Sequence, residues 1–127
     1  MAIQLNHTIV HAKDAKASAN FLTELLGLAD PGRFGPFWTV QLDNGVTLDY
    51  IQTDEPFIIE HYAFLVSEYE FDAIFGRIQQ RKLEYWADPM HSRPSEINHH
   101  DGGRGVYWND PNGHYLEIIT RPYGSGS

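Results

Sequence analysis

The amino-acid sequence contains the same strand-then-helix pattern twice, and this internal repeat constrains the fold more than any other feature. His7 interrupts one alternating apolar stretch, and His61 interrupts a second one 54 residues later (61 − 7 = 54). The same shift carries Asp14 to Glu68 and Phe21 to Phe75. Because 127 residues suit one domain, the repeat predicts a single domain built from two similar halves.

Each half contains one amphipathic helix with clear end signals. The first is expected to follow the N-cap residue Asp14 and to end at Gly27, which tolerates a left-handed conformation. The second is expected to follow Ser67, which forms a capping-box pattern with Glu70. Apolar residues recur at helical spacing in both helices: Ala15, Ala19, Leu22, Leu25 and Leu26 in the first, and Phe71, Ile74, Phe75 and Ile78 in the second.

Strand-like stretches surround the two helices. An alternating face precedes each helix, formed by Ile3, Leu5, His7 and Ile9 in the first half and by Ile59, His61, Ala63 and Leu65 in the second. Further strands are predicted at residues 32–34, 37–42 and 46–52, and again at residues 83–86, 105–108 and 114–120. The sequence therefore predicts an α+β fold in which each half has the order strand, helix, three strands.

Two segments match neither a helix nor a strand. Residues 90–103 are rich in His, Gly, Pro and Ser, and a loop of this length inside a compact domain is more often functional than idle. We expect this loop to cover the active site and to change its mobility when ligand binds. The tail Gly-Ser-Gly-Ser at residues 124–127 is expected to be flexible.

The composition excludes several classes of function. The sequence contains no Cys, so disulfide scaffolds, thiolate zinc sites and cysteine nucleophiles are excluded. A net charge of −8 disfavours a nucleic-acid partner, which usually needs a basic face. Apolar runs are too short to span a bilayer and no signal-peptide pattern follows Met1. We therefore expect a cytoplasmic protein whose partner is a small molecule, not a membrane or a nucleic acid.

Three residues form the leading candidate for a metal site. His7 and His61 occupy equivalent positions in the two halves, and Glu117 lies between apolar neighbours in a predicted strand. Two imidazoles and one carboxylate suit Fe(II), and also Mn, Co or Zn. The alternative is that the histidines are buried and hydrogen-bonded and that Glu117 faces solvent on an edge strand. Asp49 holds the place in the first half that Glu117 holds in the second, and it is a possible fourth ligand or, as we prefer, an outer partner of a ligand His.

The sequence resembles the vicinal oxygen chelate superfamily, which includes glyoxalase I, fosfomycin-resistance thiol transferases, bleomycin-binding proteins and extradiol ring-cleavage dioxygenases. The resemblance rests on His7, His61 and the segment DPNGHYLE at residues 110–117, and it covers residues 1–123 as one domain. It implies two βαβββ modules, about residues 1–54 and 55–123, that form a partly open mixed sheet or barrel around a divalent metal. It also implies a homodimer. Asp49 stands where glyoxalase I has Glu, which is a departure from the four-ligand pattern.

The C-terminal segment is also similar to the signature of extradiol dioxygenases. His99 or His100, then Val106-Tyr107, Asp110-Pro111, Gly113 and Glu117 follow the order of that signature. The resemblance implies that Tyr107 and one of His99 and His100 are catalytic, with the Tyr hydrogen-bonding substrate and the His moving a proton. One difference is that the further upstream His of such enzymes has no counterpart between Asn20 and His61.

These observations lead to one preferred function and two alternatives. The preferred function is an Fe(II)-dependent extradiol-type dioxygenase that acts on a small aromatic or vicinal dioxygen compound. The first alternative is a glyoxalase-like isomerase or lyase that uses Ni, Co or Zn, and the second is a protein that sequesters an aromatic drug or metabolite. Aromatic residues in the predicted strands could line a ligand site or fill the core: Phe37, Trp38, Tyr50, Tyr62, Trp86 and Trp108.

Overall fold

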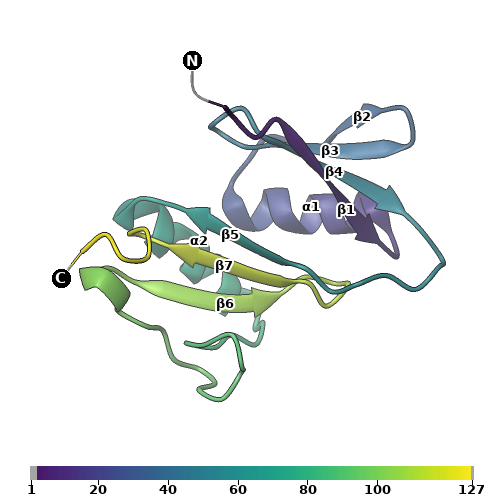
Figure 1. Ribbon diagram of the computed structural model, residues 1–127. Coiled ribbons are helices and arrows are strands. Elements are labelled where there is room, and N and C mark those ends of the chain that lie inside the picture. Colours follow the sequence, from purple (N-terminus) through teal and green to yellow (C-terminus); the bar gives the residue numbers. More distant parts are fainter. Residues whose placement is uncertain (1–2, 127) are drawn as a thin grey trace. The chain divides into compact units, whose positions relative to one another are not determined.

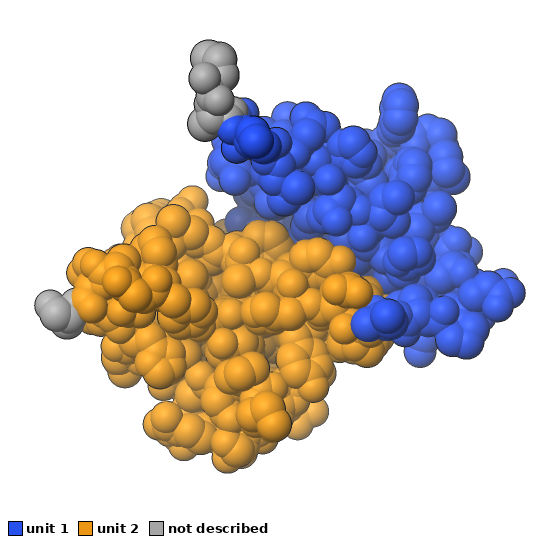
Figure 2. All heavy atoms as spheres, viewed as in Figure 1, with its two compact units in different colours: residues 1–58 blue, residues 59–127 orange. Residues whose placement is uncertain are grey.

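The computed structural model describes residues 3–126, and the chain divides into two compact units, residues 1–58 and 59–127 (Figure 2). Each unit combines one α-helix with one small sheet, which confirms the predicted α+β class. No helix within residues 3–126 combines the length and the apolar composition needed to cross a membrane.

Unit 1 is a four-stranded sheet with one helix packed on one of its faces (Figure 1). Its elements are β1 (His7–Ala12), α1 (Ala15–Leu26), β2 (Gly32–Phe34), β3 (Phe37–Gln41) and β4 (Thr47–Gln52). The strand order is β1-β4-β3-β2, with β1 parallel to β4 and the other pairs antiparallel. Apolar side chains from α1 and the sheet form the core of this unit: Val10, Ala19, Leu22, Leu25, Val40, Leu48 and Tyr50.

Unit 2 repeats this plan with fewer strands. Its elements are β5 (His61–Leu65), α2 (Glu68–Gln80), the short 3-10 helix η1 (His100–Gly102), β6 (Gly105–Asn109) and β7 (Tyr115–Ile119). The strand order is β5-β7-β6, with β5 parallel to β7 and β6 antiparallel to it. Arg104, which precedes β6, holds the start of α2 through ion pairs with Glu68 and Asp72, each at 2.8 Å.

Both helix starts have the predicted caps. The Asp14 side chain accepts a hydrogen bond from the Ala17 amide, and Gly27 ends α1 with φ 73°. At α2, the Ser67 hydroxyl accepts from the Glu70 amide while the Glu70 carboxylate accepts from the Ser67 amide. These reciprocal bonds satisfy amides that have no partner within the helix.

Several strand predictions need correction. Ile3 and Leu5 lie before β1 and are highly exposed, because residues 3–6 have no neighbouring strand that would bury an alternating face. Ile59 likewise precedes β5. The strand predicted at residues 83–86 is reduced to bridges that Trp86 makes with Pro94 and Tyr107. Within residues 3–126, neither sheet closes into a barrel.

Loss of the α2 capping box should produce a small, measurable loss of stability. We expect Ser67→Ala to lower the free energy of unfolding by ~1 kcal/mol, because one helix amide loses its acceptor. Urea denaturation measures the change. Ser125→Ala is the control, since Ser125 is exposed and its backbone amide, which the substitution keeps, donates to the Pro122 carbonyl. Equal midpoints for Ser67→Ala and the parent would contradict the prediction.

Candidate metal and catalytic site

The two units place a histidine and a carboxylate at the same relative positions on neighbouring parallel strands. In unit 1, His7 on β1 pairs with Thr47, two residues before Asp49 on β4. In unit 2, His61 on β5 pairs with Tyr115, two residues before Glu117 on β7. Side chains two residues apart on a strand point to the same face, so each His shares a sheet face with its carboxylate. The repeat predicted from the sequence is therefore present in the strand register.

In unit 2 the two side chains are in direct contact. His61 Nε2 lies 3.0 Å from Glu117 Oε1. Glu117 is fully buried because β7 is the central strand of its sheet, whereas about half of the His61 side chain is exposed. The alternative that Glu117 faces solvent on an edge strand is thus wrong. A buried carboxylate requires compensating partners, and one of them here is a potential metal ligand.

Two tyrosines complete the surroundings of Glu117. The Tyr123 hydroxyl donates a hydrogen bond to Glu117 Oε2, and the Tyr107 and Tyr123 hydroxyl oxygens lie 3.1 Å apart. Tyr107 is directly opposite Glu117 on β6, and its ring stacks on His61 with centroids 5.8 Å apart. His61, Glu117, Tyr107 and Tyr123 thus form one continuous polar cluster on one face of this sheet.

Both phenols remain protonated near neutral pH. Burial is the largest cause that raises the pKa of Tyr107, although its hydrogen bond with Tyr123 acts in the opposite direction. Burial and the hydrogen bond to Glu117 both raise the pKa of Tyr123. Each group is therefore available as a neutral hydrogen-bond donor beside the carboxylate.

The predicted catalytic histidines differ in their relation to this cluster. The His100 ring approaches Tyr123 edge-on, with centroids 6.1 Å apart. His99 is exposed, at the N-terminal side of η1.

The Asp101 carboxylate accepts hydrogen bonds from the Gly124 and Gly126 amides, and these bonds hold the segment that carries Tyr123 against η1. Tyr123 was missed by the sequence analysis because it follows the last strand and belongs to no periodic pattern.

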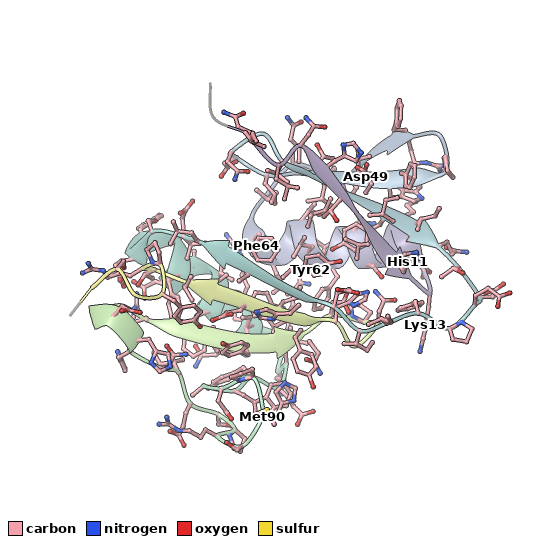
Figure 3. All side chains as sticks on the ribbon, viewed as in Figure 1. His11, Lys13, Asp49, Tyr62, Phe64 and Met90 are labelled. Atoms are coloured by element: carbon pink, nitrogen blue, oxygen red, sulfur yellow. The ribbon has the colours of Figure 1, made fainter. Side chains whose placement is uncertain are left out.

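His7 and Asp49 belong to unit 1, and their surroundings differ from those of His61 and Glu117 in unit 2. His7 is exposed and its Nδ1 lies 2.8 Å from Asn6 Oδ1. Asp49 is buried on β4, opposite Thr39 and Ile9 (Figure 3). Their roles as third ligand and outer partner stay predictions.

The donor atoms of unit 2 fit a divalent metal. Two ligand atoms that each lie ~2.1 Å from a metal at a right angle are about 3.0 Å apart. The separation of His61 Nε2 and Glu117 Oε1, 3.0 Å, matches this value. Within residues 3–126, no group of three or more His, Asp or Glu side chains gathers closely enough to hold a metal ion. His61 and Glu117 therefore stay candidates for two of the three predicted ligands, and in this structure they contact each other directly.

Comparisons with known proteins place this site in a family, although no protein-family model matches the sequence. The glutathione transferase FosA of Serratia marcescens is 31% identical over 126 residues, which cover 93% of this chain and 81% of the relative. A glyoxalase/dioxygenase from Nostoc punctiforme has the same fold, with a TM-score of 0.65, 23% identity and coverage of 94% and 91% of the two chains. The chain belongs to the vicinal oxygen chelate superfamily.

Within the vicinal oxygen chelate superfamily, a much nearer relative is known. The solved structure of the oxidase ChaP-H1 is 63% identical, covers 98% of this chain and 100% of its own, and has a TM-score of 0.95. The fold that the sequence resemblance implied is thereby confirmed.

Loss of the Tyr123 hydroxyl should weaken metal binding without removing it. We expect Tyr123→Phe to lower the affinity for Fe(II) by ~10–100-fold, because the hydroxyl orients Glu117. Anaerobic calorimetry measures the affinity, and Tyr69→Phe, on the exposed side of α2, is the matched control. Unchanged affinity in Tyr123→Phe would show that Glu117 needs no such support.

Proposed function

We propose that this protein is a metal-dependent dioxygenase that uses O₂ to cleave the ring of a small aromatic or vicinal dioxygen compound, in the manner of extradiol dioxygenases, with Fe(II) as the metal. The observation that carries this proposal is the contact between His61 and the buried Glu117, 3.0 Å apart and flanked by the phenol of Tyr107. The similarity to a protein named an oxidase also favours oxidation over glyoxalase-like isomerisation or simple binding.

Different residues of unit 2 would bind the metal, contact the substrate and orient the carboxylate ligand. His61 and Glu117 would hold the metal, which, when bound, supplies redox chemistry with O₂ and positions for two vicinal substrate oxygens. The raised pKa of Tyr107 keeps its phenol protonated, so Tyr107 would donate a hydrogen bond to a substrate oxygen. Tyr123 keeps the Glu117 carboxylate oriented.

A loop histidine would receive or return the proton of the substrate hydroxyl. The His100 ring lies against the ring of Tyr123, which places this histidine beside the cluster. An imidazole can accept a proton at one ring nitrogen and donate one from the other, which suits this role. His99, its exposed neighbour, is the second candidate for this role.

The decisive experiment measures O₂ uptake. The protein is loaded with Fe(II) under anaerobic conditions, and its metal content is determined by elemental analysis. Air-saturated buffer and a panel of catechols are then added. We expect stoichiometric iron, O₂ consumption and a product that has gained two oxygen atoms. Stoichiometric iron with no O₂ uptake for any catechol would contradict the proposal.

The same preparation distinguishes the alternatives. Turnover of a hemithioacetal with Ni, Co or Zn would indicate a glyoxalase-like isomerase. Tight binding of an aromatic compound by a protein that takes up no metal would indicate a sequestering protein. The effect of His7→Ala on iron content tests the third ligand, and sedimentation analysis tests the expected homodimer.

A further inference from the structure

The His91 side chain is sandwiched between two aromatic rings. Its imidazole lies 3.6 Å from the Trp86 ring, centroid to centroid, with an angle of 3° between the planes. It also stacks on Tyr115, at 4.7 Å and 24°. Because the indole is centred over one face of the imidazole, the phenol must lie over the other face. Trp86 and Tyr115 thus enclose a flat space that is the thickness of one ring, and His91 fills it.

His91 occupies this space in an unfavourable conformation. Its φ is 58°, a left-handed value that is strained for a non-glycine residue. Its Nε2 atom is buried without a hydrogen-bond partner among the described residues. A buried polar atom left unsatisfied is unfavourable because it has lost its hydration. Both features indicate that the imidazole is held less firmly than its close stacking implies.

The ring sandwich lies on the same sheet face as the candidate metal site. Trp86 and Tyr107 exchange two backbone hydrogen bonds of 2.9 Å, so their side chains share a face. Tyr107 shares that face with Glu117, and Tyr115 is two residues from Glu117 along β7. At ~3.3 Å per residue, Tyr115 is about 7 Å from Glu117 along the strand.

A second unsatisfied polar atom is found beside the sandwich. Asn109 is opposite Tyr115 on β6, and its Oδ1 atom is buried without a partner among the described residues. An oxygen in that position can accept a hydrogen bond from a ligand hydroxyl. The ligand favoured by these groups is therefore a flat ring that carries a polar substituent.

We propose that the space between Trp86 and Tyr115 is a binding site for one planar aromatic ring, and that His91 occupies it until the ligand displaces the imidazole. This proposal rests on the proposed function in one respect, because it places an aromatic substrate on the face that carries His61 and Glu117. Hydrogen bonds within the loop hold residues 88–93 together, because the Asp88 carboxylate accepts from the Ser92 and Arg93 amides.

Binding of 2-naphthol to metal-free protein tests the site directly. This compound has one hydroxyl and cannot chelate through vicinal oxygens, so its binding does not depend on the metal. Calorimetry should show a lower dissociation constant for His91→Gly than for the parent, by ~2–10-fold, because a stacked aromatic pair contributes about that much. Glycine also accepts the left-handed φ of 58°, so the loop conformation is kept.

Two further substitutions should have the opposite effect. His91→Phe should bind 2-naphthol more weakly than the parent, because a phenyl ring fills the space and leaves no nitrogen unsatisfied. Tyr115→Leu should weaken binding by ~2–10-fold, because one stacking partner is lost. Circular dichroism confirms that each variant is folded.

Met90→Gly is the matched control for loop flexibility. Met90 is the exposed neighbour of His91 in the same loop (Figure 3). We expect it to bind 2-naphthol as the parent does. Equal tightening in Met90→Gly and His91→Gly, or unchanged binding in both His91→Gly and Tyr115→Leu, would overturn the proposal. Binding as expected without O₂ uptake by the iron-loaded protein would leave the ring site standing and overturn only the proposed dioxygenase function.

Discussion

Glu117→Gln is expected to abolish tight metal binding and turnover. The substitution keeps the size of the side chain but removes the negative charge that faces His61. Glu117 is fully buried and contacts both His61 and Tyr123. Removing its charge should therefore lower the metal affinity by more than the ~10–100-fold that is typical when an outer partner is removed. Calorimetry and elemental analysis after dialysis measure the affinity and the metal content.

Thermal unfolding separates a ligand role from a structural one. A metal that binds only the folded protein stabilises it by about 2.7 kcal/mol at a concentration of 100 Kd. The parent should gain this stability when Fe(II) is added, and Glu117→Gln should not. Without metal, the Glu117→Gln variant should be at least as stable as the parent, because a buried charge costs free energy.

Glu96→Gln is the control variant. It changes an exposed carboxylate that pairs with Arg93, and it should bind metal as the parent does. Parent-level iron in Glu117→Gln would show that the metal site is misassigned.

Tyr107→Phe is expected to lower turnover by ~10²–10⁴-fold while the metal is retained. Its hydroxyl is a protonated donor next to the Glu117 cluster, and general acid–base groups contribute factors of this size. Steady-state O₂ uptake gives the rate, and elemental analysis gives the iron content. The double variant His99→Ala/His100→Ala should also lose turnover and keep the metal.

Tyr62→Phe is the matched control for Tyr107→Phe. Tyr62 follows His61 on β5, so its side chain points to the opposite face of the sheet, where it meets His114 edge-on (Figure 3). Its turnover should equal that of the parent. If Tyr107→Phe and the double His variant both turned over an authentic substrate at the parent rate, the extradiol-type mechanism would be wrong.

The local features of the fold could be predicted because they depend on residues close in sequence. The cap of α1 at Asp14 and the capping box of Ser67 and Glu70 use atoms three residues apart, and both are present. The equivalence of His7 and His61 followed from the repeat, and the strand register confirms it. The sequence left open whether Glu117 is buried or faces solvent, and the central place of β7 in its sheet decides for burial.

The sequence by itself determined the two modules, their helices and the pairing of His61 with Glu117 as candidate ligands, because period and spacing specify which face a side chain occupies. Only the tertiary structure decided which further groups meet that pair. Tyr123 reaches Glu117 because Asp101 binds the C-terminal backbone, and His91 reaches Trp86 and Tyr115 because a nonperiodic loop folds over the sheet. Such contacts join segments distant in sequence, and their geometry depends on how the loops close, which no local pattern encodes.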